Sequence, residues 1–354
     1  MAHDLMIRNG KVAMFCVGER DSAWHKLGQR TMNVVTWSEA MRLADLDWQV
    51  VKIQQTAVNP LGVRVDIPRM ATFRVDDGAY LGTVGEDYAV IQNKDQFNHV
   101  DTFLEATDGA HYETAGALGN GERVWCLARI PEADYVIDGG DQHRAYLMCA
   151  NSHDGSLAFT MKLVDTRVVC ANTLAVAIRE NGSAFRIRHT TNAHARMAEA
   201  VKVMQTVKKE AVGLKAKMES LAERKLTRES TEKILDRLFP KSAEGNQTRR
   251  ENVLSEVLSL YESNDRNAYP SVKGTAYNLL NAVTEYTDHL RTARGQGTQP
   301  EKMAIARAES ALFGSGERLK TQALDVILEC TGGQVKHTVN YSGALLDAVI
   351  AQSN

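Results

Sequence analysis

The sequence predicts an α+β protein with a β-rich, mostly antiparallel front half and a helical back half. In the first half, short β-branched runs are separated by turn sequences such as Asp76-Asp77-Gly78 and Gly119-Asn120-Gly121. From His194 onward, apolar residues recur every three or four positions instead. Many short strands with hairpin turns and a few interspersed helices favour a mostly antiparallel α+β domain.

The first predicted helix follows Thr36, because Thr36 and Glu39 fit a capping box. Another helix is expected over 94–106, and a third is expected to begin near Asn172, where Asn172 or Thr173 would be its cap. Strands are expected at 48–58, 70–75, 80–84, 88–91, 111–118, 122–130, 143–150, 157–164, 167–170 and 184–189.

A long basic helix is predicted after Asn192, which would cap it. Its apolar residues over 204–221 follow a heptad seam, as in a packed arm or a short coiled coil. Thr227 would cap a second helix, which Pro240 ends. Further helices are expected at 249–262, 275–294, 301–312, 318–330 and 343–351.

These patterns divide the chain into three predicted parts. Residues 1–193 would form the antiparallel sheet domain and 194–240 the basic helical arm. Residues 241–247 form a polar linker, and 248–354 would form a helical C-terminal region.

Composition favours a globular protein of the cytoplasm. The chain has 354 residues, of which 44% are hydrophobic and 24% charged. No apolar run approaches the ~20 residues that span a bilayer, and the first residues do not resemble a secretory signal. Five widely spaced cysteines without a C-x-x-C pair are typical of reduced thiols, so we expect no zinc site and no membrane partner.

Positive charge is concentrated in the middle of the chain. The formal net charge is −2, yet residues 162–240 contain 16 Lys and Arg against 9 Asp and Glu, a local excess of +7. Such asymmetry suits a surface that meets a polyanion, and it equally suits a solvated helical arm.

The strong catalytic signatures are absent from the sequence. It contains no phosphate-binding G-x-x-x-x-G-K-[ST] loop, no G-x-G-x-x-G, no H-E-x-x-H and no G-x-S-x-G. We therefore expect no nucleotide cofactor, and a binding protein rather than an enzyme. An active site assembled from distant residues stays open.

The segment Asn151, Ser152, His153, Asp154 and Gly155 invites comparison with a catalytic triad. Triad members must converge in space, whereas neighbours in an extended loop point in different directions. A turn stabilised by local side-chain hydrogen bonds is the preferred interpretation, and contact with a ligand or a phosphate is the next.

Three basic positions suggest contact with phosphate. Arg186 and Arg188 would project together from one face of a strand, about 6.6–6.8 Å apart, which matches neighbouring phosphates on a nucleic-acid strand. Arg167, beside a helix start at Asn172, is a second candidate anion site. The complete set of predicted nucleic-acid contacts is Lys162, Arg167, Asn172, Arg186, Arg188, His189, Arg196, Lys202 and Lys209.

Several motifs resemble a phage- and plasmid-borne family of unassigned domain function. They are Trp24-His25-Lys26-Leu27-Gly28, Asn151-Ser152-His153-Asp154-Gly155, Arg167 to Leu174, Arg188-His189-Thr190, Gly274-Thr275-Ala276-Tyr277, Asn281 to Tyr286 and Asp288-His289. The match runs in order over nearly the whole chain. The association of this family with phage and plasmid DNA processing and with anti-defence genes implies a role on DNA.

The leading hypothesis is a non-enzymatic DNA-binding protein, with single-stranded DNA favoured, acting as a homo-oligomeric annealing and recombination factor. A rival is a protein-binding accessory or inhibitor of a host defence system, with the 204–221 seam as its contact surface. A third is a metal-dependent nuclease, for which Asp154 and Asp165 are the candidate ligands.

Overall fold

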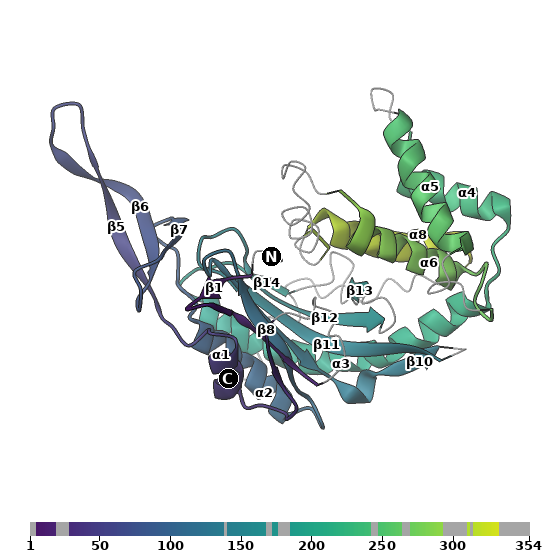
Figure 1. Ribbon diagram of the computed structural model, residues 1–354, viewed down its shortest axis with the longest axis horizontal. Helices are drawn as coiled ribbons and strands as arrows, with labels where there is room; N and C mark the ends of the chain where they lie inside the picture. The colour runs from purple at the N-terminus through teal and green to yellow at the C-terminus, as the bar shows by residue number, and fades with distance from the viewer. Residues whose placement is uncertain are drawn as a thin grey trace, which may run out of the picture.

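The computed structural model describes residues 5–18, 28–137, 140–167, 172–175, 185–241, 247–263, 270–292, 310–311 and 314–332. It confirms the predicted α+β class. Antiparallel sheets fill the front half of the chain, and most of the helices lie in the back half (Figure 1).

The main body is a nine-stranded sheet. Seven strands run in the order β13 (Asn172–Ala175), β12 (Phe159–Arg167), β11 (Asp141–Ser152), β9 (Arg123–Arg129), β8 (His111–Leu118), β3 (Met14–Val17) and β4 (Gln29–Thr31). Off this path, β10 (Tyr135–Ile137) pairs with β11 and β14 (Phe185–Ile187) pairs with β12. Only the β3–β4 pair is parallel among these. A separate two-stranded ladder joins β1 (Ile7–Arg8) and β2 (Lys11–Val12).

Three helices cover one face of this sheet: α1 (Trp37–Leu43), α2 (Asn93–Glu105) and α3 (Ala193–Glu223), all below the sheet in Figure 1. Alternate residues of β12, Phe159, Met161 and Leu163, are buried on this face in one core with Met197 and Val201 of α3. The predicted capping box at Thr36 is confirmed. Asn192 precedes α3, but its side chain makes no capping hydrogen bond.

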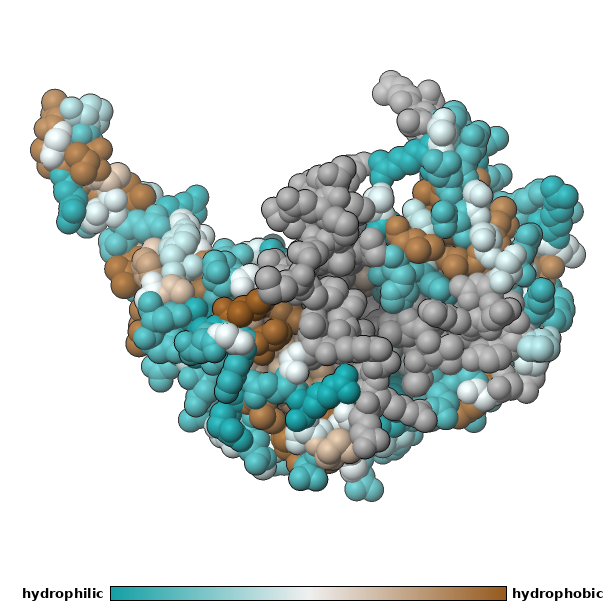
Figure 2. Space-filling model, in the orientation of Figure 1, coloured by the Kyte–Doolittle hydropathy of each residue, from teal (hydrophilic) through white to brown (hydrophobic). Residues whose placement is uncertain are grey.

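A three-stranded sheet of β5 (Val50–Val58), β6 (Arg64–Arg74) and β7 (Tyr80–Val84) lies beside the body. The hairpin of β5 and β6, here called the arm (residues 50–74), projects far from the body (Figure 1). Apolar residues colour much of its outer part brown in Figure 2. The β5–β6 register shifts between Gln54 and Thr56, so a bulge separates the outer arm from its base.

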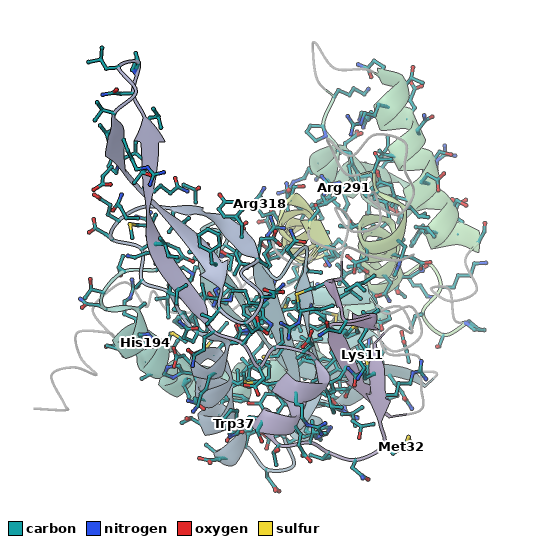
Figure 3. All side chains as sticks on the ribbon, turned by 60° about the vertical axis from the view of Figure 1, so that its left-hand side comes forward. Lys11, Met32, Trp37, His194, Arg291 and Arg318 are labelled. Atoms are coloured by element: carbon teal, nitrogen blue, oxygen red, sulfur yellow. The ribbon has the colours of Figure 1, made fainter. Side chains whose placement is uncertain are left out.

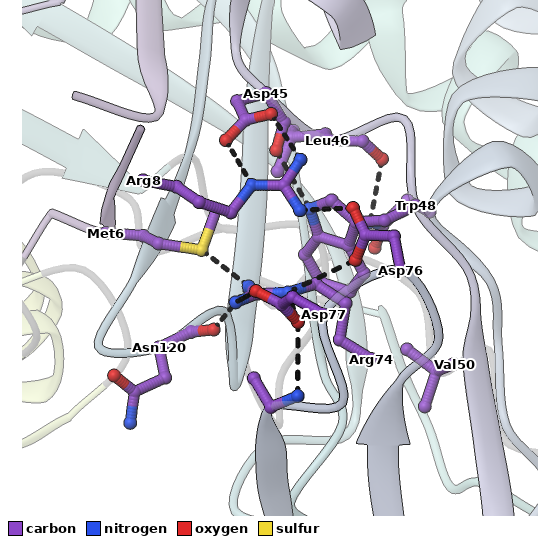
Figure 4. Close-up of polar contacts among 12 residues, drawn as sticks. Met6, Arg8, Asp45, Leu46, Trp48, Val50, Arg74, Asp76, Asp77 and Asn120 are labelled. Carbon is purple, nitrogen blue, oxygen red and sulfur yellow. Dashed lines mark hydrogen bonds and ion pairs between the residues drawn. The ribbon is translucent and has the colours of Figure 1, made fainter. Parts of the chain in front are cut away.

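Two arginines hold the base of the arm (Figure 4). Arg74 is 4% exposed, forms a two-bond ion pair with Asp77 at 2.6 and 2.8 Å, and donates to the Asn120 carbonyl at 2.6 Å. Its guanidinium also lies 5.3 Å from the ring centre of Trp48. Arg8 joins Asp45, by two bonds of 2.7 Å, to Asp76. The arm is therefore fixed to the body where it emerges.

The remaining helices form the C-terminal region, on the upper right in Figure 1. They are α4 (Arg228–Leu238), α5 (Gln247–Ser263), α6 (Ala276–Glu285), the π-helical turn η2 (Tyr286–Leu290) and α8 (Ser315–Cys330); a short 3₁₀ turn, η1 (Pro131–Ala133), precedes β10. Thr227 caps α4 as predicted, and Thr275 caps α6. One hydrophobic core extends from the sheet through α3 into α4, α6 and α8.

Two predicted elements were wrong. The helix expected near Asn172 is strand β13 over its described residues, because residues 172–175 pair with 164–167 of β12. Residues 88–91 are not a strand: Ala89 N–H bonds to the His189 carbonyl, and Tyr88 stacks on the His189 ring. The helices predicted at 343–351 and over most of 301–312, and residues 242–246 of the linker, lie outside the described residues.

Within the described part of the chain, no helix is both long and apolar enough to cross a membrane.

Candidate functional site: an arginine face beside a buried lysine cluster

Arg186 lies in strand β14, and Arg188 directly follows this strand. Ile187, between them, is buried in the α3-side core and pairs with Phe159, so Arg186 projects from the opposite face of the sheet. The Arg186 side chain is 45% exposed, and Arg188 is exposed. Both arginines are exposed, and their joint contact with phosphate stays a prediction.

A glutamate from α8 meets Arg186 and Lys162 together. Glu317 is 4% exposed and lies 3.1 Å from Lys162 Nζ and 3.4 Å from Arg186 Nη2. Two of the predicted phosphate contacts thus share one carboxylate of the same chain. One turn further along α8, Lys320 pairs with Asp288 at 2.6 Å.

Burial alters the chemistry of Lys162. The residue is 1% exposed, and its desolvation lowers the pKa of the ammonium to about 8, although Glu317 acts in the opposite direction. Lys320 and Arg186 also lower this pKa by charge repulsion. Lys162 was predicted to lie on an accessible basic surface, and this is wrong: it lies beneath α8, where a phosphate cannot reach it without moving that helix.

Among the other predicted basic residues with described side chains, Arg196 does not extend the Arg186–Arg188 face. Arg196 is exposed on α3, and α3 packs on the opposite side of the sheet. In Figure 3, Arg318 of α8 lies in the upper half of the view, toward which the arm projects. His194, in the first turn of α3, lies lower, on the side away from the projecting arm. Lys202 and Lys209 are in α3, Arg167 in β12 and Asn172 in β13, but their side chains lie outside the described atoms.

Three predicted contact residues are internal structural groups. His189 is 8% exposed; its Nδ1 lies 3.0 Å from the Ala89 carbonyl, and its ring stacks on Tyr88 at 4.4 Å. Burial lowers the pKa of His189, which disfavours a cationic ring. Asn151 and His153 are fully buried: Asn151 donates to the Ile91 carbonyl at 2.9 Å, and His153 Nε2 lies 3.0 Å from Asn93 Oδ1. Burial also lowers the pKa of His153, to about 3.

Asp154, the remaining loop candidate, borders an open cleft of about 570 Å³. Its Oδ1 accepts the Ser156 N–H at 2.8 Å, so the turn interpretation holds for His153 to Ser156, whereas Asn151 and Ser152 belong to strand β11. Glu122, across the cleft, accepts the Asn120 N–H at 2.5 Å. Both carboxylates therefore stabilise turns.

A second buried cluster was not predicted. His143 of β11 lies between Asp165 Oδ2, 2.6 Å from Nδ1, and the Tyr277 hydroxyl, 2.7 Å from Nε2. Tyr277, from α6, donates to Asp141 Oδ2 at 2.6 Å. Tyr135 stacks on the His143 ring at 4.6 Å, and burial raises the pKa of the Tyr135 hydroxyl well above its usual value.

These hydrogen bonds join side chains of β11, β12 and α6. His143, Asp165, Tyr277 and Asp141 are all at most 4% exposed, so no substrate reaches them. The cluster can fasten α6 to β11 and β12.

Little in the sequence pointed to these partners. Asp165 was considered only as a metal ligand, and Tyr277 only as part of a family motif. Glu317 and Lys320 are one helical turn apart on an ordinary amphipathic helix, and nothing local marks that turn as buried.

The geometry also bears on the two rival hypotheses. Leu214, Met218 and Leu221 of the predicted seam are buried in the protein's own core, so the described part of the seam offers no contact surface.

The two candidate metal ligands of the nuclease hypothesis lie far apart. Asp154 lies beyond one end of β12, and Asp165 is six positions inside this strand, about 20 Å from that end. No group of three or more metal-ligating side chains occurs among the described residues.

Comparison with known proteins gives a family and no function. No curated protein and no solved structure matches the chain. Residues 80–312, more than half of the chain, match a family described as "Domain of unknown function (DUF932)". This segment contains β14 and both partners of the His143–Tyr277 bond, whereas the arm and Glu317 lie outside it. The chain therefore belongs to the DUF932 family.

Proposed function

We propose that the protein binds DNA by its phosphate backbone through the arginine face, defined as Arg186, Arg188 and Arg318. The observation that carries this proposal is the exposure of Arg186, in β14, and of Arg188, one residue beyond the end of that strand. Arg318 is exposed on α8, next in sequence to the Glu317 that contacts Arg186. Guanidinium groups suit phosphate because they donate in a planar fork.

The arginine face implies weak binding by a single copy. If three arginines each neutralise one phosphate on a single strand, log K falls with log salt with a slope of about −2, since each contact contributes ~0.7. Glu317 competes for Arg186 and weakens the interaction further. Tight binding would then require several copies along one strand.

The finer proposal is a homo-oligomeric factor that anneals single strands of phage or plasmid DNA in the host cytoplasm. It needs no cofactor, because duplex formation itself is favourable. The support for this part is the resemblance to a family borne on mobile elements, together with the small number of arginines per copy, which favours an oligomer.

Fluorescence anisotropy with labelled single- and double-stranded DNA, over a salt series, tests the proposal. Arg186→Ala with Arg188→Ala should weaken binding and reduce the salt slope by about 1.4, which is two contacts of ~0.7. Arg228→Ala is the matched control: this side chain is 93% exposed on α4, paired only weakly with Glu232 at the surface. Salt-independent binding, or an equal loss in both variants, would contradict the proposal.

A further inference from the structure

The arm has an unusual surface for a projecting hairpin. Its residues 53–63 contain no charged side chain. Six of the exposed large apolar residues of the protein lie on the arm: Val51 (42% exposed), Ile53 (52%), Val58 (66%), Leu61 (86%), Val63 (55%) and Val65 (39%). Exposed apolar side chains gathered in one place, unlike scattered ones, indicate an interaction surface.

The backbone of the arm is also open to pairing. β5 pairs with β6 alone, and β7 reaches only residues 70–73 of β6. The outer arm is therefore a two-stranded ribbon, an arrangement that is marginally stable by itself in water. Edge strands of natural proteins are normally protected by charges or by proline. Pro68 interrupts β6 in this way, but β5 contains no proline and, beyond Lys52, no charge.

The arm is built to stay extended. Arg74 and Arg8 fasten its base to the body, as described above. At the bulge, the Gln54 side-chain amide lies 2.5 Å from the Ile67 carbonyl and 3.2 Å from the Arg69 carbonyl, so the irregular backbone is itself bonded. Lys52 points back to the body, where it donates to the carbonyls of Glu86 and Tyr88. These contacts hold the apolar outer arm away from the rest of the chain.

We propose that the arm pairs with the arm of a second copy of this chain, β5 against β5 in antiparallel register. Such a pair satisfies the open backbone groups of both edges at once. The uncharged stretch makes it self-compatible, because no like charges face each other when two copies of residues 53–63 are brought together.

Pairing of the two β5 edges alone is too small for a stable interface, so the tips of both arms must also take part. β5 has nine residues, about 30 Å in length, and neighbouring strands lie only about 5 Å apart. Edge pairing alone therefore buries far less than the roughly 800 Å² per partner of a standard stable interface. In an antiparallel pair, the tip of each arm reaches the base of the other, so Leu61 and Val63 pack against the partner arm. This inference does not depend on DNA binding.

Light scattering after size exclusion, over a range of protein concentrations, measures the association. The wild type should form a closed two-copy species, and Ile53→Lys with Leu61→Lys should remain a single copy. Both side chains are exposed in the isolated chain, so the fold should survive, which circular dichroism checks. The matched control, Met32→Lys with Val136→Lys, places the same charges at exposed apolar sites on the body, 64% and 50% exposed, and should not change the mass.

Mixing identifies the partner as a second copy. The variant Ile53→Glu with Leu61→Glu should also be a single copy, and mixing it with the lysine variant should restore the two-copy species. A wild type that stays a single copy at every concentration, or one that forms open-ended aggregates, overturns the proposal. So does a lysine variant that still pairs, or a mixture that does not.

Discussion

Gly82 of β7 allows the turn between β11 and β12 to approach. A Cβ added at this position would lie 2.5 Å from Asp154 Cβ and 2.7 Å from its Cα, closer than atoms can pack. Gly82→Ala should therefore lower the free energy of unfolding by about 1–3 kcal/mol, the usual effect of overpacking. Urea denaturation measures this. Gly85→Ala meets nothing within 4 Å and is the control; equal losses in both variants would exclude a steric cause.

Because of Lys162, the stability of the folded protein should depend on pH in the alkaline range. Its pKa is lowered from the ordinary 10.5 to about 8 in the folded chain, so the unfolded chain binds more protons between these values. The contribution of Lys162 to stability therefore rises as pH increases from about 8 to 10.5. We expect the unfolding free energy of the wild type to rise, relative to Lys162→Met, over this window. A constant difference between the two proteins would show that Lys162 is not desolvated in solution.

Tyr277 should be a large contributor to stability among the tyrosines. Tyr277→Phe removes the bonds to His143 and Asp141, both buried, and the loss of a buried partner costs about 1–3 kcal/mol for each group. Tyr80→Phe is the control, since Tyr80 is 51% exposed and bonds only to Thr83. Thermal unfolding compares them. A similar small effect in both would mean that the His143 cluster contributes little to holding α6.

For single residues, the sequence predicted the type of interaction better than the group that takes part in it. It identified Arg186 and Lys162 as phosphate contacts, whereas the carboxylate that both contact in the fold is Glu317, 131 positions beyond Arg186. Charge counts cannot find such a pair, because ion pairing depends on which helix packs on which strand. His189 was predicted as a nucleic-acid contact and His153 as a candidate in a loop that meets a ligand, but both side chains are buried.

Among the elements, the arm base should be sensitive to acid. The bonds from Arg74 lower the pKa of Asp77 from 3.8 to about 2. A depressed carboxyl pKa contributes stability above the unfolded value, and this contribution is lost as pH falls from about 4 to 2. Cleavage within the arm by an acid-active protease should accelerate over this range. In Asp77→Asn, cleavage should already be faster at neutral pH and should change less with pH. Identical profiles would show that this ion pair does not hold the arm.

Elements with strong local signals were predicted well. The β8–β9 hairpin, the Thr36 and Thr227 caps and α3 depend on turn, capping or periodic residues that are adjacent in sequence. The helix predicted to begin near Asn172 was wrong because a capping residue and a strand residue look alike in sequence until the partner strand is known. The outer half of β6 was not expected to be a strand, since Asp66 and Pro68 break the pattern there.

For the whole molecule, the α+β class could be predicted from the sequence, but the order of the strands in the sheet could not. Sequential hairpins such as β8–β9 and β11–β12 follow from their turns, but β3 beside β8 and β9 beside β11 are set by packing against α1, α2 and α3. This arrangement also separates the basic residues of the middle of the chain, because β14 and α3 are close in sequence yet present their arginines on opposite faces.

Pairing through the arm and binding through the arginine face should reinforce each other. In the proposed complex, two joined copies would present two arginine faces to one strand of DNA, and the second contact would become intramolecular. The Ile53→Lys, Leu61→Lys variant should therefore bind long single strands more weakly than the wild type and short ones equally, as anisotropy would measure. Equal weakening for long and short strands would mean that the substitutions impair the arginine face itself.

The bulge at Gln54 has a consequence for how this hairpin could vary. Each residue gained or lost in a strand moves the following side chains to the opposite face, so deleting Gln55 would turn the β5 side chains beyond the bulge over without changing the Arg74 anchor. The facing direction of the exposed β5 side chains can therefore change independently of the contacts that hold the base of the hairpin.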